Sequence, residues 1–115
     1  CGYNIITAMD AIDMKPAELA AKIKEIIGDM PVYLTFDIGA LDPSAAPGTG
    51  TPVAGGPTSD YVRKTIQGLV GLNVVAADMC EVLPDMDPCH ITSIAAATLT
   101  QDIMYLNHEA RKGDR

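Results

Sequence analysis

The order of apolar patterns along the chain restricts its fold more than any other feature. Three short runs have the length and the β-branched or aromatic content of buried strands: residues 4–8, 32–36 and 72–77. Each is followed by a segment with apolar residues at helical spacing: Pro16 to Gly28, Ser59 to about Gly68, and Ile91 to about Glu109. Strands and helices in alternation predict parallel strands joined by right-handed crossovers, and therefore an α/β fold.

A parallel sheet of three strands is thin. Such sheets are normally covered on both faces, and an unpaired hydrophobic edge strand invites aggregation. The chain has 115 residues, enough for one small domain, and it begins at Cys1 and runs directly into an apolar segment. We therefore expect residues 1–115 to be part of a single domain, whose remaining strands come from upstream sequence.

Composition narrows the class of protein. Hydrophobic residues make up 48% of the chain and charged residues 20%, as in a soluble globular domain. The net charge of −7 offers no basic surface for nucleic acid or an anionic membrane, and it suits a cationic small molecule or a metal ion. Cys1, Cys80 and Cys89 form no CxxC pair, which favours a reducing compartment and hence the cytoplasm.

Residues 37–58 lack any hydrophobic period. They contain four prolines and five glycines, and the segment is much longer than ordinary connections, which have a median of about 4 to 6 residues. We expect this long loop to be functional. Within it, Asp42 before Pro43 is expected to organise a turn through local backbone hydrogen bonds.

Carboxylates follow two of the expected strands. Asp37 comes after the second strand, and Asp78 and Glu81 come after the third. Ligands of open α/β sheets bind beyond the carboxyl ends of the strands, and oxygen ligands suit magnesium or manganese. Asp37 is therefore the first candidate metal ligand, with a role as a loop cap as the alternative.

Several motifs resemble one enzyme family. Residues 37–43 read DIGALDP, residues 47–52 read PGTGTP, residues 78–84 read DMCEVLP, and Ile91-Thr92 is followed by AAATL. These segments resemble the signatures of the ureohydrolase (arginase/agmatinase) family, and Gly28 to Phe36 is similar to bacterial agmatinases in particular. The resemblance covers essentially the whole chain.

The resemblance implies a three-layer α/β fold of which this chain is the C-terminal portion. It also implies two manganese ions bridged by a hydroxide that attacks a guanidinium carbon and releases urea, in a full-length enzyme expected to be a homo-oligomer. By the same resemblance, Asp37 bridges both metals, Glu81 pairs with the substrate guanidinium, and Thr51 lies close to it. The expected reaction is agmatine to putrescine and urea, with a guanidino acid such as guanidinobutyrate as the alternative substrate.

The chain departs from the family at Gly39, where a second aspartate ligand is expected. The GGDH motif and the Asp-Ala-His-x-Asp cluster have no counterpart, and His90 and His108 match neither. We therefore expect the isolated chain to be inactive and to hold metal weakly. The alternative function is a noncatalytic fragment or paralogue that packs against, or regulates, a complete ureohydrolase.

Other residues have structural interpretations beside functional ones. The PGTGTP loop lacks the Lys-Ser/Thr ending of a phosphate loop and is expected to shape the substrate pocket. Cys89-His90 is expected to serve in a loop or helix entry rather than as nucleophile and base, because no orienting group is evident. The remaining candidates are expected at a site rim or in solvent (Asp85, Asp87), in packing (Met79, Cys80, Met86), and on a solvated helix end (Glu109, Arg111, Lys112, Asp114).

Overall fold

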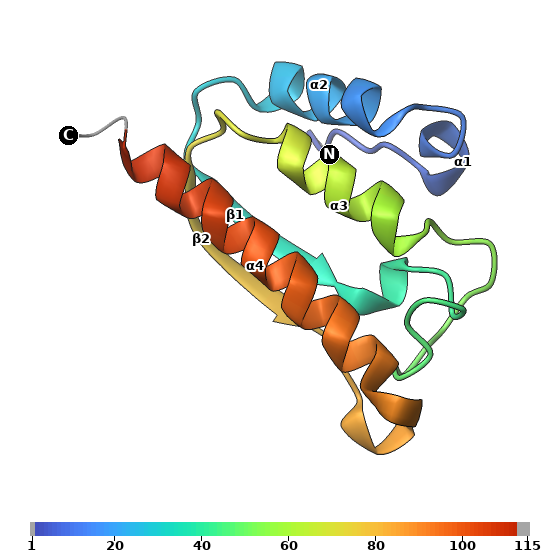
Figure 1. Ribbon diagram of the computed structural model, residues 1–115. Coiled ribbons are helices and arrows are strands. Elements are labelled where there is room, and N and C mark those ends of the chain that lie inside the picture. Colours follow the sequence, from blue (N-terminus) through green and yellow to red (C-terminus); the bar gives the residue numbers. More distant parts are fainter. Residues whose placement is uncertain (1, 113–115) are drawn as a thin grey trace.

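The computed structural model describes residues 2–112. Two strands and four α-helices follow one another with short 3₁₀ turns between them (Figure 1). Their bounds are α1 (Ala8–Ala11), α2 (Pro16–Ile27), β1 (Val32–Asp37), η1 (Ile38–Ala40), α3 (Ser59–Gly68), β2 (Val74–Cys80), η2 (Pro84–Met86), η3 (Pro88–His90) and α4 (Ile91–Lys112). Cys1 and Asp114, for which the sequence suggested roles, lie outside the described residues.

Local signals set the ends of the helices. Pro16 occupies the first turn of α2, and the helix ends at Gly28, whose φ of 60° is a left-handed conformation that glycine adopts readily. Helix α3 begins after Thr58, whose hydroxyl accepts a hydrogen bond from the Tyr61 amide at 3.1 Å. Both helices are confirmed within a residue of the predicted bounds.

The two strands pair in parallel, as predicted for strands joined by a helical crossover. Val32, Leu34 and Phe36 are half-buried against the helices, whereas Tyr33, Thr35 and Asp37 alternate with them on the open face. This period of two is the pattern of a strand with one covered face. The sheet therefore presents one of its faces to solvent in the described chain.

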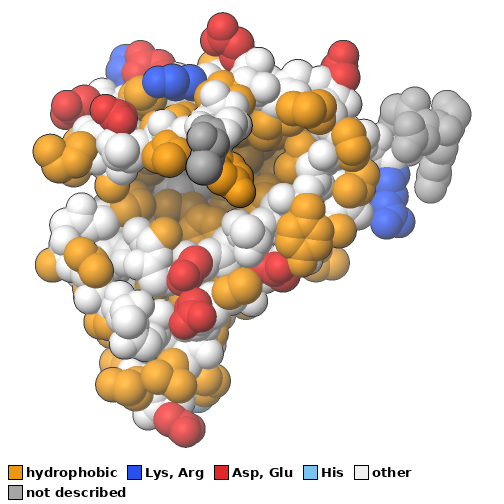
Figure 2. All heavy atoms as spheres, turned by 180° about the vertical axis from the view of Figure 1, so that it is seen from behind, with side chains coloured by type: hydrophobic (Ala, Val, Ile, Leu, Met, Phe, Trp, Pro, Cys, Tyr) orange, Lys and Arg blue, Asp and Glu red, His pale blue; other side chains and the backbone are white. Residues whose placement is uncertain are grey.

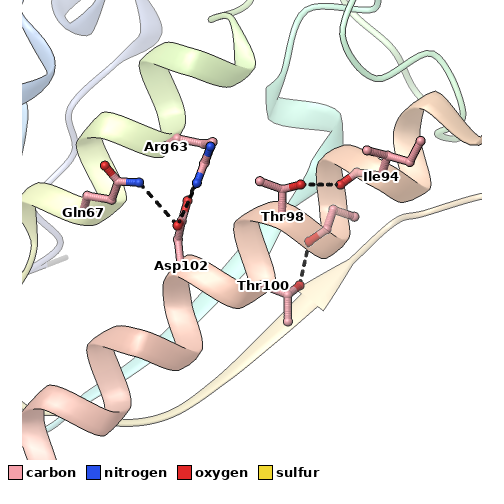
Figure 3. A network of polar contacts seen from close by, with 7 residues as sticks. Arg63, Gln67, Ile94, Thr98, Thr100 and Asp102 are labelled. Carbon is pink, nitrogen blue, oxygen red and sulfur yellow. Dashed lines mark hydrogen bonds and ion pairs between the residues drawn. The ribbon is translucent and has the colours of Figure 1, made fainter.

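The helices cover the other face. Helix α4 packs against β2, α3 packs against α4, and α2 packs against α3 (Figure 1). Figure 3 shows Arg63 of α3 reaching Asp102 of α4, with Nε to Oδ2 at 2.9 Å. The core beneath these contacts contains buried residues from η1, the loop after it, α3, β2 and α4. They include Ile38, Leu41, Ile66, Val74, Leu99 and Leu106.

The predicted first strand is wrong. Among the described residues, 4–8 form no strand, and Thr7 caps the short helix α1 instead, with its hydroxyl accepting from the Asp10 amide at 3.1 Å. Isolated apolar residues here have no neighbouring strand, and Ile5 is 78% exposed. With no strand beside it, the segment forms no strand ladder, and the local cap of α1 organises only its end. The last strand, predicted at residues 72–77, begins two residues later and ends three residues later, at Val74–Cys80.

Helix α4 agrees with the prediction in place but not in burial. Its first half was expected to be buried nearly all round, yet Ile94 is 62% exposed while Leu99 is fully buried. Met86 was expected in packing and is 62% exposed, whereas Met79 packs against the core. Within residues 2–112, only one side of α4 has a partner.

A hollow runs beside β1. Its volume is about 840 Å³, and apolar side chains of α2, α3 and β1 line it, including Ile23, Leu34 and Ile66. Figure 2 shows hydrophobic side chains gathered around a hollow on this side of the molecule. No helix among the described residues is long and apolar enough to cross a membrane.

Candidate functional site

The strand ends bring the predicted site residues to one edge of the sheet. Asp37, the last residue of β1, lies opposite Cys80, the last residue of β2. Glu81 follows directly, so it leaves the same edge one residue farther on. The parallel register thus places the two predicted carboxylates next to each other in the fold, as the topology predicted.

Asp37 makes a local backbone contact. Its Oδ1 accepts a hydrogen bond from the Gly39 amide at 2.8 Å, and its side chain is exposed. This contact caps η1, which is the structural role that the sequence left open for Asp37. One carboxylate oxygen of Asp37 is therefore occupied by a backbone amide at the start of the loop.

Gly39 faces Asp37 and the buried Thr49. A Cβ atom built on Gly39 would lie 3.0 Å from Asp37 Oδ1 and 3.3 Å from Thr49 Oγ1. Gly39 does not have the positive φ that favours glycine. A side chain at position 39 would thus point between Asp37 and Thr49 of the PGTGTP loop, and both neighbours would have to shift slightly to admit it.

The PGTGTP loop lies between the two strand ends. The carbonyl of Gly48 accepts from the Leu83 amide at 2.8 Å, which ties the loop to the segment after β2. A Cβ atom on Gly50 would lie 3.9 Å from Glu81 Oε2, so the Glu81 carboxylate lies beside the loop. Thr51 is exposed at the next position. The loop thus lies against the segment that follows β2, and it does not open directly into a helix.

Glu81 has an unusual backbone conformation. Its φ is 70°, and among the described non-glycine residues only Cys89 and His90 share a positive φ. All three lie between β2 and α4. Non-glycine residues in this region cost free energy and are found most often where a side chain must be aimed. The Glu81 carboxylate is exposed and lies beside Gly50 of the PGTGTP loop.

Asp78 is the centre of a polar cluster on the open sheet face. Its carboxylate accepts from the Tyr33 hydroxyl, from Thr35 Oγ1 at 2.6 Å and from Cys80 Sγ at 3.0 Å. The bonds from Cys80, Thr35 and Tyr33 lower the pKa of Asp78 to about 2. The bond to Asp78 raises the pKa of the Cys80 thiol. The raised pKa keeps the thiol protonated and agrees with the expectation of an unreactive cysteine. Cys80 is, however, only half-buried and lies in a polar cluster rather than in apolar packing.

Asp42 organises its turn as predicted. Its carboxylate accepts from the Ser44 amide at 3.0 Å and from the Gly55 amide at 2.8 Å. The Ser44 hydroxyl and amide, together with the Gly55 amide, lower the pKa of Asp42 to about 2. Asp42 thus closes both ends of residues 42–55 without any need for a metal ion.

Asp87 has a role that the sequence reading missed. Its carboxylate accepts from the Thr92 amide at 2.7 Å and from the Ser93 amide at 2.8 Å, so it caps the first turn of α4. Burial raises its pKa, but the bonds from Ser93 and Thr92 together prevail and lower the pKa to about 2. An aspartate shortly before a helix is a capping signal that could have indicated this role.

The neighbouring residues follow the structural interpretations. Cys89 and His90 form the left-handed turn that lets the chain enter α4, as expected. Asp85 is exposed in the loop. His90 and His108 are also exposed. At the end of α4, Lys112 Nζ lies 2.7 Å from Glu109 Oε1, a contact typical of a solvated helix end.

The donor set does not by itself fit a two-manganese centre. Across residues 2–112, no three His, Cys, Asp or Glu side chains come together as a possible metal site. Asp37 is the one carboxylate at the end of β1, and position 39 has no side chain. Divalent metal sites need several ligands in a set geometry. Any such centre would need donors from outside these residues.

The comparisons with known proteins agree with the motifs. A sequence profile described as the Arginase family matches residues 1–106. An agmatinase of Escherichia coli O1:K1 / APEC is 49% identical over 113 residues, which are 98% of this chain and 37% of that protein. The structure of a hypothetical agmatinase from Burkholderia thailandensis has a TM-score of 0.92 at 42% identity, covering 97% of this chain and 36% of that one.

A third relative has another substrate in its name. Proclavaminate amidino hydrolase from Streptomyces clavuligerus has a TM-score of 0.91 at 36% identity, covering 95% of this chain and 37% of that one. The chain therefore spans a little over a third of the length of its relatives. High structural similarity over this part confirms the predicted fold class, an α/β portion of an arginase-like fold.

Proposed function

The chain belongs to the arginase family, and on this premise we propose that it is the C-terminal portion of an agmatinase-type ureohydrolase domain. In the complete enzyme, which depends on manganese, the reaction is the hydrolysis of agmatine to putrescine and urea. The 115-residue chain alone is inactive in this proposal. The 49% identity to an agmatinase supports agmatine, and a guanidino acid is the alternative substrate.

One observation carries the proposal. Asp37, the PGTGTP loop with Thr51, and Glu81 come from three separate segments and lie at the same end of the sheet. Ligands of α/β proteins bind at this end of the strands. Their common end of the sheet supports the proposal that the residues which the family motifs mark for substrate and metal form one site.

Glu81 has the chemistry for a guanidinium group. A carboxylate can accept two parallel N–H donors from that planar cation, which fixes both position and orientation. Thr51 is exposed and follows Gly50, whose built Cβ would lie 3.9 Å from Glu81 Oε2. The net charge of −7 favours the approach of a cationic substrate. Glu81 and Thr51 are thus proposed to bind substrate, and neither performs the bond-breaking step.

The manganese in this proposal is inferred from the family resemblance alone. Asp37 would provide one ligand, and the others would have to come from residues outside those described. A bound metal ion lowers the pKa of a bound water and so supplies hydroxide near neutral pH. We assign no step of this chemistry to the present chain.

The second candidate function is a noncatalytic partner of a complete ureohydrolase. Gly39 favours it, because a glycine cannot replace the aspartate ligand of the family. In either case we propose a cytoplasmic protein that forms homo-oligomers in its complete form. The composition supports the compartment, and the family resemblance supports the assembly.

A hybrid enzyme tests the function. The 113 matched residues of this chain would replace the corresponding segment of the E. coli agmatinase, with Gly39 kept in one form and Gly39→Asp in the other. Urea release from agmatine and from guanidinobutyrate, and bound manganese, would be measured for both. We expect Gly39→Asp to raise manganese content and turnover sharply. Equal activity and equal metal content of the two forms would show that position 39 is no ligand position.

A further inference from the structure

We propose that Thr92 and Asp87 are positioning residues that hold Thr51 and Glu81 in register for the guanidinium group. This inference rests on the proposed function. The two residues and Gly48 form a unit that we call the helix-entry clasp, because it joins the PGTGTP loop to the start of α4. Neither Thr92 nor Asp87 is proposed to touch the substrate.

The first contact of the clasp is a buried hydrogen bond. The Gly48 amide donates to Thr92 Oγ1 at 2.7 Å, and Thr92 is completely buried. On its other side, the Gly48 carbonyl accepts from the Leu83 amide at 2.8 Å. Gly48 therefore joins three parts of the fold: its own loop after β1, the segment after β2 that contains Leu83, and the start of α4. A buried amide that loses its acceptor must move or remain unpaired, so this link is sensitive to Thr92.

The second contact is steric. A Cβ atom on Gly48 would lie 2.7 Å from Asp87 Cβ and 2.9 Å from Asp87 Cα, which leaves no room for a larger residue. Asp87 is itself held by the amides of Thr92 and Ser93 and by Ser93 Oγ at 2.7 Å. The loop backbone thus lies directly against a side chain that the helix keeps in place.

Each of the two segments joined at Gly48 also contains one member of the proposed substrate-binding pair, Thr51 or Glu81. Gly48 is three residues before Thr51, and Leu83 is two residues after Glu81. The Glu81 carboxylate also lies close to Gly50, as the distance of 3.9 Å to a built Cβ indicates. A shift of Gly48 would therefore move Thr51 and Glu81 relative to each other. Misplacement of a binding group by about 1 Å can cost on the order of 100-fold in rate.

The test uses the hybrid enzyme in its Gly39→Asp form, so that position 39 does not limit activity. Thr92→Val keeps the side-chain shape and removes the acceptor of the Gly48 amide. We expect KM for agmatine to rise about tenfold with a smaller change in kcat, because the binding pair is displaced while the reacting centre is not touched. Thr92→Ser restores the hydroxyl and should return KM to near its original value.

The chain offers a matched control on the same helix. Thr100 Oγ1 donates to the Ala96 carbonyl at 2.7 Å within α4 and contacts no loop residue through that hydroxyl (Figure 3). Thr100→Val should leave KM unchanged. Asp87→Asn provides a second test should Thr92→Val fold poorly, and about a threefold rise in KM is expected, since the amide keeps one acceptor oxygen.

Amide hydrogen exchange separates the clasp from the function. Peptides covering residues 48–52 and 81–84 should exchange faster in Thr92→Val than in the parent hybrid, and Thr100→Val should not change them. Absence of urea release from the parent hybrid would overturn the proposed function. In that case the amide exchange rates of the two peptides would be the test of the clasp. An unchanged KM in an active Thr92→Val hybrid, or unchanged exchange of both peptides, would overturn the clasp.

Discussion

Asp42, Asp78 and Asp87 each accept several hydrogen bonds, and each has a pKa of about 2 against an ordinary value of 3.8. They hold different structures: a loop closure, a polar cluster between strands, and a helix start. Because the pKa is lower in the folded chain, the ionised carboxylate favours folding. Their contribution is complete above the ordinary pKa and is lost as the pH falls through 3.8 toward 2.

The prediction for Asp42 is a loss of stability with acid that depends on its charge. Asp42→Asn should destabilise the hybrid enzyme at pH 6, and the difference from the parent should shrink as the pH falls below about 4. Urea denaturation midpoints measured between pH 6 and pH 3 would check this. A difference that stayed constant over the whole range would mean that the carboxylate charge contributes nothing.

A second prediction for a single residue concerns the proposed role of Glu81 in guanidinium binding. Glu81→Ala in the hybrid should weaken guanidinium binding roughly 10-fold to 100-fold, since a hydrogen bond to a charged group contributes about 1.5–3 kcal/mol. Manganese content should remain unchanged. Glu81→Gln keeps the shape and should lose most of the same affinity. Steady-state KM and metal analysis would be compared, and a loss of manganese in either variant would place Glu81 in the metal site instead.

At the scale of elements, close approach of helices depends on small residues. Gly68 ends α3 where the helix meets α2, and a Cβ there would lie 2.7 Å from Ala20 Cβ. Ala20 is fully buried. The contact between α2 and α3 is thus set by the absence of a side chain, although glycine weakens a helix by about 1 kcal/mol relative to alanine.

Gly68→Ala should therefore destabilise the protein despite its higher helix propensity. Overpacking costs about 1–3 kcal/mol, which exceeds the expected gain in propensity. Ala20→Gly removes the opposing methyl group, so the double variant should be more stable than the sum of the two single changes predicts. Urea unfolding of the four forms gives the coupling, and strictly additive effects would show that the helices can separate freely.

At the scale of the whole molecule, both edges and one face of the two-stranded sheet are open within residues 2–112. Large apolar side chains are exposed with them, such as Tyr33 at 62% and Met104 at 67%. In a stable domain these surfaces have partners, and unpaired strand edges favour association. The relatives are nearly three times as long as the matched segment, so the proposed upstream portion has ample length to cover them.

The isolated chain should therefore self-associate or lack a sharp thermal transition. Size-exclusion chromatography and thermal denaturation would test this, with the hybrid enzyme as the control that has its surfaces covered. A monomeric elution profile together with a cooperative transition would contradict it.

Metal binding by the isolated chain follows from the donor set. Asp37 with Gly39 is too sparse to hold two manganese ions, so calorimetric titration should detect weak binding at one site at most. Gly39→Asp should strengthen it only modestly, because the remaining ligands would still be absent. Two tight manganese sites on this chain would overturn the assignment.

The sequence by itself determined the elements with strong local signals. The helix that begins after Thr58 and the proline and glycine at the ends of α2 depend on neighbouring residues, and each was predicted correctly. Residues 32–36 were correctly predicted as a strand, but the expected burial was wrong, because alternate residues of β1 are exposed. The motifs likewise indicated the family, and the position of Asp37 and Glu81 followed from parallel topology. The missing strand at residues 4–8 was decided by tertiary structure, because an apolar run forms a strand only beside another strand. The same reason applies to Asp78 and Cys80, whose contacts with Thr35 depend on strand pairing, and to the close approach of Gly48 to Asp87, because no local pattern contains those distances.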